Sequence, residues 1–92
     1  MEFEWDPAKA VANLRKHGVS FDEAATVLAD SLSLTVPDPD HSQDEERYIT
    51  VGLSISRRLL LVAHTDRDRR IRLISARELT ATERIAYEHG NF

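Results

Sequence analysis

The first apolar residues of the chain recur at the spacing of a helix. Val11 and Leu14 lie three positions apart, downstream of Asp6 and Pro7. An aspartate accepts a hydrogen bond from a free backbone N–H at a helix start, and proline suits the first helical position. Glycine commonly follows the last residue of a helix, so Gly18 marks the end. These signals predict a helix over residues 7–17, preceded by a short extended segment at residues 3–5.

A second helix is predicted directly after the first. Ser20 and Glu23 have the spacing of a capping box, in which each side chain bonds the backbone N–H of the other residue. The apolar positions that share one face of this helix are Phe21, Ala24, Ala25 and Leu28. Because only two residues separate the elements, we expect the two helices to form a helical hairpin.

The pattern changes to the two-residue period of strands after position 30. Leu32, Leu34 and Val36 alternate with serine and threonine, as in a strand with one buried face. Short turns separate the strands that follow, so neighbouring strands must run antiparallel. These further strands are predicted at Arg47–Ser54, Arg58–Thr65 and Arg70–Arg77.

A last helix completes the predicted order. Thr80 and Glu83 repeat the capping-box spacing just before an apolar stretch. The elements then follow as β-α-α-β-β-β-β-α, an α+β fold with a mainly antiparallel sheet. The length indicates a single domain over residues 1–92.

The longest irregular stretch, residues 37–46, joins the first of these antiparallel strands to the second. It holds five acids between positions 38 and 46, and its length is typical of a mobile or partner-binding loop. The acids and His41 lack the glycine and the ligand spacing of a calcium loop. We therefore expect no metal site, and no other motif implies a cofactor.

Simple two-residue turns would fix which residues lie opposite one another in the sheet. They would align Arg47 with His64 and Ile71, and Leu53 with Arg58 and Arg77. His64 and Arg77 would then lie six residues apart in register, about 20 Å along the strands, too far for one site to use both. The predicted shared face comprises Arg47, Ile49, Val51, Leu53, Leu60, Val62, His64, Ile71, Leu73 and Arg77.

Charge is divided unevenly along the chain, whose net charge is −4. Residues 1–46 carry eleven acids and three bases, a balance of −8, whereas residues 57–77 carry seven arginines and two acids, a balance of +5. The planar fork of arginine suits bidentate contact with phosphate or carboxylate. The later strands are thus predicted to form either a basic binding face or merely solvated hairpin ends.

The chain has no cysteine, which excludes disulfides and thiolate metal sites and favours a cytoplasmic protein. Its longest unbroken apolar run, residues 59–63, has five residues. Such a run is too short to cross a bilayer or to act as a signal peptide, so no membrane partner is expected.

Motifs along nearly the whole chain resemble the BrnT family of toxins. The opening motif includes residues 3–6, Lys16-His17-Gly18 and Glu23-Ala24; the strand section includes Glu46-Arg47, Gly52, Thr65, Arg67 and Ile74-Ser75-Ala76-Arg77. Glu83-Arg84 and Tyr87 resemble the closing helix of that family. The resemblance implies a RelE-like fold, metal-independent RNA cleavage that inhibits translation and growth, and neutralisation by a BrnA-type antitoxin. That antitoxin is a ribbon-helix-helix protein, which would make any contact with DNA indirect.

Cleavage of RNA without a metal needs a base for the 2′-hydroxyl proton, cations for the phosphate and a donor for the departing oxygen. The resemblance and these needs together make candidate catalytic residues of Arg77, Tyr87, Lys16, His17, Arg47 and His64. The candidate phosphate-binding residues are Arg67, Arg69, Arg70, Arg72 and Arg84.

Each candidate also has a structural interpretation. Lys16 and His17 suit the last turn of a helix, where cations stabilise the helix dipole. His64 would be hydrogen-bonded within a core strand, Tyr87 would be packed on the sheet, and Arg47 and Arg77 would be in surface ion pairs. The alternative function is a non-catalytic binding module that keeps the fold and the antitoxin interface.

Overall fold

The three helices begin at the caps that the sequence predicts, and the first also ends at its predicted glycine. The structure, a computed structural model, describes residues 1–92, with helices α1 at Pro7–His17, α2 at Phe21–Val27 and α3 at Ala81–Glu88. Asp6 accepts a hydrogen bond from the Ala8 N–H at 2.8 Å. Gly18 ends α1 with a φ of 68°, a left-handed conformation that glycine adopts without strain. The predicted helical hairpin and closing helix are confirmed.

The two predicted capping boxes differ in outcome. Thr80 and Glu83 form theirs completely, with each side chain bonded to the other residue's N–H. At α2 only half forms, because Ser20 Oγ accepts from the Glu23 N–H at 3.1 Å while the Glu23 carboxylate binds Arg58. The predicted hydrogen bond from the Ser20 N–H to the Glu23 carboxylate is therefore absent. The prediction of a complete box is wrong, because a guanidinium is a stronger partner for a carboxylate than one N–H.

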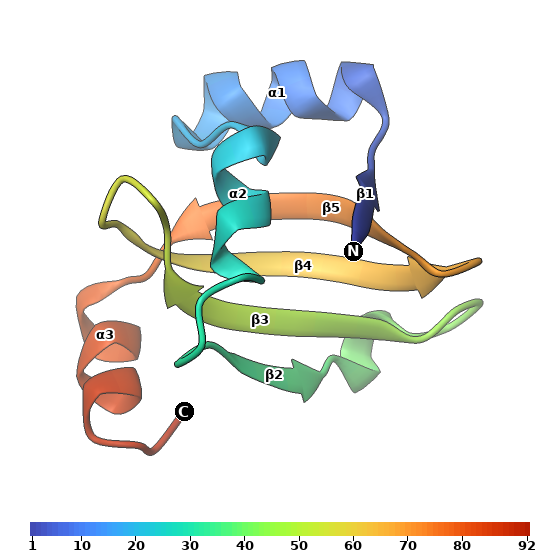
Figure 1. Ribbon diagram of the computed structural model, residues 1–92. Helices are drawn as coiled ribbons and strands as arrows, with labels where there is room; N and C mark the ends of the chain where they lie inside the picture. Colours follow the sequence, from blue (N-terminus) through green and yellow to red (C-terminus); the bar gives the residue numbers. More distant parts are fainter.

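The five strands form one sheet in the order β1-β5-β4-β3-β2 (Figure 1). β1 runs parallel to β5, and the other neighbours are antiparallel, which confirms the α+β class and the element order. The bounds are Glu2–Glu4 for β1, Leu34–Pro37 for β2, Arg47–Leu53 for β3, Leu59–Arg67 for β4 and Arg70–Glu78 for β5. One turn of 3-10 helix at Pro39–His41 lies within the 37–46 loop.

Helices α1 and α2 cover one face of the sheet, whereas α3 follows β5 and lies apart from them beside the end of the sheet (Figure 1). Trp5 packs edge-on against Phe21, with ring centroids 5.9 Å apart, so this aromatic pair belongs to the core and its surroundings. The buried core residues between helices and sheet are Val19, Phe21, Ala24, Val27, Leu60, Val62, Leu73 and Ala76.

Asn13 fixes α1 to β5 beyond the point where β1 ends. β1 pairs with β5 only as far as Glu4, opposite Arg72. The buried Asn13 side chain then bonds the Ala76 backbone, with Nδ2 donating to the carbonyl at 2.9 Å and Oδ1 accepting from the N–H at 3.0 Å. One side chain thus replaces a strand partner at the residue next to Arg77.

The β3–β4 hairpin has a longer turn than predicted. Residues 55–57 form it, and Arg57 has a φ of 64°, a conformation uncommon for residues other than glycine. The register therefore moves by one residue, and Arg47 lies opposite Thr65. The predicted alignment of Arg47 with His64 is wrong.

The β4–β5 hairpin turns one residue later than predicted. Asp68 and Arg69 form a two-residue turn with φ values of 50° and 68°. Both positions are left-handed, as the twist of a tight hairpin requires, but glycine or asparagine usually occupies them. The predicted rows through Ile71 and Arg77 are wrong for this reason.

A bulge in β5 changes the register a second time. Leu73 lies opposite His64, but Ser75 lies opposite Ala63, which leaves Ile74 as the extra residue. Arg77 consequently lies opposite Leu61.

The corrected register divides the predicted shared face between the two sides of the sheet. Leu60, Val62 and Leu73 lie on the side covered by α1 and α2, and so does His64, the partner of Leu73. Arg47 and Arg77, among other residues, lie on the opposite side, which we call the open face. His64 and Arg77 cannot share a site, because they are on different faces.

Candidate active site

The open face carries a groove of about 410 Å³ bounded by the 37–46 loop and α3. It brings together two of the predicted catalytic residues, Arg47 and Arg77. The residues that line it are Asp38, His41, Arg47, Ile49, Leu61, Ala63, Ile74, Ser75, Arg77, Glu83 and Phe92. Apolar strand residues and charged side chains thus meet in one groove.

Arg47 and Arg77 are close enough to serve one ligand. Their partners on β4 are Thr65 and Leu61, so the two arginines lie four positions apart along the sheet. This is about 13 Å along the strands and, across the intervening β4, two strand spacings or about 10 Å, so the two backbones are about 16 Å apart. Both long side chains line the same groove. A chain of phosphates laid across the open face would meet both guanidinium groups.

Arg77 is held by a bidentate ion pair with Glu83. Nη1 and Nη2 donate to the two carboxylate oxygens at 2.7 and 2.9 Å, and Nη1 also donates to the Glu78 carbonyl at 3.2 Å. Hydrogen bonding to Arg77 is the main reason why the pKa of Glu83 falls from 4.5 to about 2. Three of the five donors of Arg77 are used, so two stay available.

Arg47 has no such partner. Its guanidinium makes no hydrogen bond or ion pair, and its Nε is buried without an acceptor. It is the one arginine of the chain that is both unpaired and partly buried. A buried unsatisfied donor costs stability, so a cationic side chain left in this state beside a groove indicates a place for an acceptor from a ligand.

A histidine that sequence reasoning considered only as a metal ligand lies in the same groove. His41 Nδ1 is 2.9 Å from Asp38 Oδ2, and both residues line the groove with Arg47. The imidazole is 65% exposed, whereas the Asp38 side chain is 14% exposed. The spacing of an aspartate and a histidine three residues apart was visible in the sequence, but its place beside Arg47 was not.

Most of the predicted phosphate-binding arginines are paired with carboxylates from the acidic first half of the chain. The pairs are Glu2–Arg70 at 3.2 Å, Glu4–Arg72 at 2.7 Å and Glu45–Arg67 at 3.0 Å. Carboxylates of the first half therefore neutralise part of the positive charge of residues 57–77. Phosphate binding by these arginines stays a prediction. Arg69 and Arg84 are exposed and have no carboxylate partner.

The remaining predicted histidine and lysine sites lie away from the groove. His64 is 4% exposed, with Nε2 2.7 Å from Thr50 Oγ1, and burial lowers its pKa. Its Nδ1 is buried without a partner. Lys16 and His17 are in the last turn of α1, on the helix side of the sheet. The structure does not bring these three residues together with Arg77.

Tyr87 is bonded to a loop rather than directed into the groove. Its hydroxyl donates to the Leu32 carbonyl at 2.9 Å, which fastens α3 to the segment between α2 and β2. Burial is the main cause that raises its pKa. This geometry fits the structural interpretation of Tyr87 better than the catalytic one.

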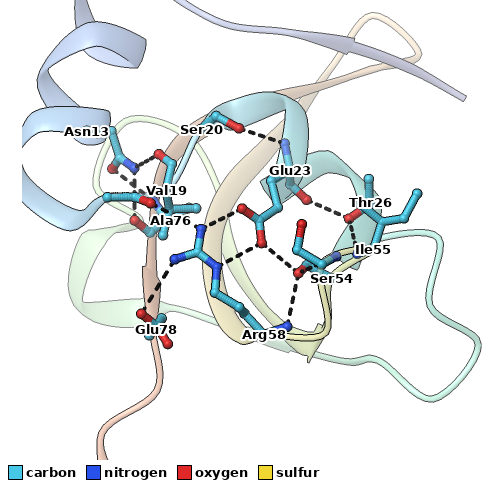
Figure 2. Close-up of polar contacts among 12 residues, drawn as sticks. Asn13, Val19, Ser20, Glu23, Thr26, Ser54, Ile55, Arg58, Ala76 and Glu78 are labelled. Atoms are coloured by element: carbon cyan, nitrogen blue, oxygen red, sulfur yellow. Dashed lines mark hydrogen bonds and ion pairs between the residues drawn. The ribbon is translucent and has the colours of Figure 1, made fainter.

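Arg58, on the helix side, uses four of its five donors in a network of side chains (Figure 2). Arg58 donates through Nε and Nη2 to Glu23, and Nη2 also donates to the Gly18 carbonyl at 3.1 Å. Ser54 Oγ donates to the same Glu23 carboxylate at 2.7 Å. The network joins α2 to the β3–β4 hairpin, and the Arg58 hydrogen bonds lower the pKa of Glu23.

No group of three or more histidine and acidic side chains is placed to hold a metal ion. No helix of the chain is long and apolar enough to cross a membrane.

Comparisons with known proteins agree with the fold. A family model described as "Ribonuclease toxin, BrnT, of type II toxin-antitoxin system" matches residues 5–83. Among solved structures, the chain is similar to the Brucella abortus ribonuclease toxin BrnT, with a TM-score of 0.69 and 20% sequence identity. The match covers 87% of this chain and 97% of that one. No curated protein sequence matches the chain.

Proposed function

The chain belongs to the BrnT family of ribonuclease toxins of type II toxin–antitoxin systems, and we propose that it cleaves RNA in the open-face groove without a metal ion. The observation that carries this proposal is the position of Arg47 and Arg77 on the same face, with donors left free for a phosphate. The predicted RelE-like fold agrees with the solved BrnT structure.

RNA supplies its own nucleophile, so the protein must stabilise charge and move protons. When the 2′-oxygen attacks phosphorus, negative charge grows on the phosphate oxygens, and preorganised guanidinium groups can stabilise it. Glu83 holds the guanidinium fork of Arg77 through two hydrogen bonds, and the two remaining donors of Arg77 are free to bind a ligand. Arg47 gains the acceptor that it lacks in the free protein.

The exposed arginines contribute secondary contacts under this proposal. Arg69 and Arg84 can meet phosphates outside the groove, and Arg67, Arg70 and Arg72 are held only by partly exposed ion pairs, which are worth about 0–1 kcal/mol. Their loss should weaken RNA binding and its salt dependence without stopping the chemical step.

Cleavage of RNA by the purified protein in EDTA tests the proposal. We expect 2′,3′-cyclic phosphate and 5′-hydroxyl ends, and no cleavage of DNA, which lacks the 2′-hydroxyl. Arg47→Ala and Arg77→Ala should each lose activity, whereas Arg15→Ala, on exposed α1, should match the wild type. Activity that disappears in EDTA and returns with magnesium would contradict the metal-independent mechanism.

A type II toxin implies an antitoxin partner. We propose a BrnA-type ribbon-helix-helix antitoxin that covers the open face and holds any DNA for the complex. It should protect the backbone amides of β3 and the end of β5 from hydrogen exchange. Protection confined to α1 and α2 would show inhibition from a distance.

One observation favours the alternative of a non-catalytic binding module: Glu83 occupies much of Arg77 in the free protein, whose net charge is −4. Expression of the chain alone, and then with its antitoxin, separates the two functions. Growth arrest relieved by the antitoxin supports the nuclease, and unimpaired growth with a stable complex supports the module.

A further inference from the structure

The end of the groove next to β3 holds a histidine–carboxylate pair, and the phosphate contacts proposed above give this pair no role. His41 Nδ1 and Asp38 Oδ2 are 2.9 Å apart, and both residues line the groove that Arg47 and Arg77 share. The phosphate contacts described above supply charge, but they leave the 2′-hydroxyl proton without an acceptor.

The 37–46 loop builds this pair onto the backbone of Arg47. The Asp38 N–H donates to the Arg47 carbonyl at 2.9 Å, and the Arg47 N–H donates to Ser42 Oγ at 2.9 Å. Ser42 Oγ in turn donates to the Asp38 carbonyl at 2.6 Å. These bonds close the loop at its base, and the 3-10 turn at Pro39–His41 carries the imidazole above it. The loop that carries the histidine is therefore tied to the backbone of the free arginine.

The hydrogen bond to Asp38 determines which imidazole nitrogen is free. With the less exposed carboxylate accepting from Nδ1–H, the Nε2 atom is a bare acceptor on an exposed ring. A carboxylate in this position also stabilises the imidazolium that forms when Nε2 takes a proton.

The other histidines do not offer this arrangement. His64 is buried on the opposite face and bonded to Thr50, His17 lies on α1, and His89 is the exposed C-cap of α3. Of the four histidines, His41 alone lines the groove.

We propose that His41 is the general base of the groove and that Asp38 is its positioning residue, an inference that rests on the proposed RNA cleavage. His41 Nε2 takes the proton of the 2′-hydroxyl as the 2′-oxygen forms its bond to phosphorus. The bond from phosphorus to the 5′-oxygen breaks, and that oxygen keeps the electron pair and receives a proton from water. The products are a 2′,3′-cyclic phosphate and a 5′-hydroxyl, and the imidazolium returns its proton to solvent.

Steady-state cleavage of a short RNA by His41→Ala, His41→Gln and Asp38→Asn tests this assignment. We expect the two His41 variants to lose about 100-fold in kcat with a nearly unchanged KM. Added imidazole should restore part of the activity of His41→Ala. His89→Ala is the matched control and should equal the wild type. All variants should keep the wild-type melting temperature, because His41 is exposed and its loop is closed by Ser42 and backbone bonds.

The pH profile of kcat tests the role of Asp38 separately. Asp38→Asn should reduce kcat about 10-fold and move the limb of the profile that His41 produces. The charged groups around His41 in the two adjoining pockets are Asp38, Asp40, Asp44, Glu45, Arg47, Arg77 and Glu83. A profile identical to that of the wild type would overturn the positioning role.

The outcomes separate this inference from the proposed function. If Arg47→Ala and Arg77→Ala are inactive while His41→Ala keeps the wild-type kcat, the groove is the site but His41 is not its base. A His41→Ala variant that loses affinity alone, with no response to imidazole, overturns the inference in the same way. If all these variants are as active as the wild type, the placement of cleavage in the groove fails.

Discussion

The Arg58 network on the helix side and the groove on the open face use arginine in different ways. On the helix side, Arg58 is surrounded by Glu23, Glu78 and the Gly18 carbonyl, and its contacts join α2 to the β3–β4 hairpin. On the open face, Arg47 has no acceptor and Arg77 keeps two donors free. All three residues are arginines, but they differ in how many of their N–H donors have an acceptor. An arginine whose contacts join two elements stabilises the fold, and one with free donors beside a groove is left for a ligand.

Replacement of a hydrogen-bonded residue on the helix side should therefore lower mainly the free energy of unfolding. Asn13→Ala should lower it most. The change removes three hydrogen bonds and leaves the buried backbone of Ala76 unsatisfied. We expect a loss of about 3 kcal/mol in the free energy of unfolding, measured by urea denaturation. Lys9→Ala, on the exposed surface of the same helix, is the control and should change it by about 0.5 kcal/mol or less. A loss under about 1 kcal/mol would show that Asn13 is not what fastens α1 to β5.

Glu23→Gln should have the next largest effect on stability. It removes the charge that Arg58 and Ser54 surround, at a side chain only 14% exposed. The expected loss is about 2 kcal/mol in the same measurement. Asp22→Asn, an exposed acid in the first turn of the same helix, should lose about 0.5 kcal/mol. Equal losses for the two variants would mean that the helix dipole, and not the Arg58 network, explains Glu23.

Acidification tests the carboxylate that the open face uses to hold Arg77. The pKa of Glu83 is about 2 in the folded protein against its usual 4.5. Because the folded-state pKa is the lower one, the stabilisation is complete above pH 4.5 and is lost as the pH falls toward 2. Glu83→Gln should remove about 1 kcal/mol of this pH-dependent stability, since the pair is partly exposed and also caps α3. If the difference in the free energy of unfolding between wild type and variant does not change between pH 4.5 and 2, the assignment is contradicted.

Arg47→Ala should have the smallest effect on stability of the four changes. Its guanidinium has no partner to lose, so the free energy of unfolding should stay within about 0.5 kcal/mol of the wild type. Cleavage of RNA should nevertheless be lost, which is the reverse of the pattern expected for Asn13→Ala. A loss of 2 kcal/mol or more would place Arg47 with the structural arginines.

The local parts of the fold were predictable, because short-range chemistry determines them. Asp6, Gly18 and Thr80 each act within a few residues of their own position, so the helix ends follow directly from the sequence. The register was not predictable. Arg57 and Arg69, among other turn residues, adopt left-handed conformations that glycine would have signalled, and arginine gives no such signal.

The candidate site was predictable only in part. Arg47 and Arg77 were predicted to share a face, and they do, but the register that gives them their neighbours in the groove was not visible in the sequence. The pairing of Arg70 and Arg72 with Glu2 and Glu4 depends on β1, which meets β5 from the far end of the chain. Contacts across nearly seventy residues of sequence leave no local pattern.

The bulge at Ile74 decides the sign of the charge that β5 presents to the groove. Side chains alternate between the two faces along a strand, so one extra residue exchanges the odd and even positions after it. With the bulge, Arg77 lies on the open face and Glu78 on the other; in an unbroken ladder, the two would exchange places. The cation in the groove thus depends on Ile74 staying outside the ladder. If Ile74 paired with Ala63, Glu78 would take the face of Arg77 without any substitution. The way one apolar residue is accommodated, unpaired or paired, therefore decides whether the end of this strand attracts or repels a phosphate.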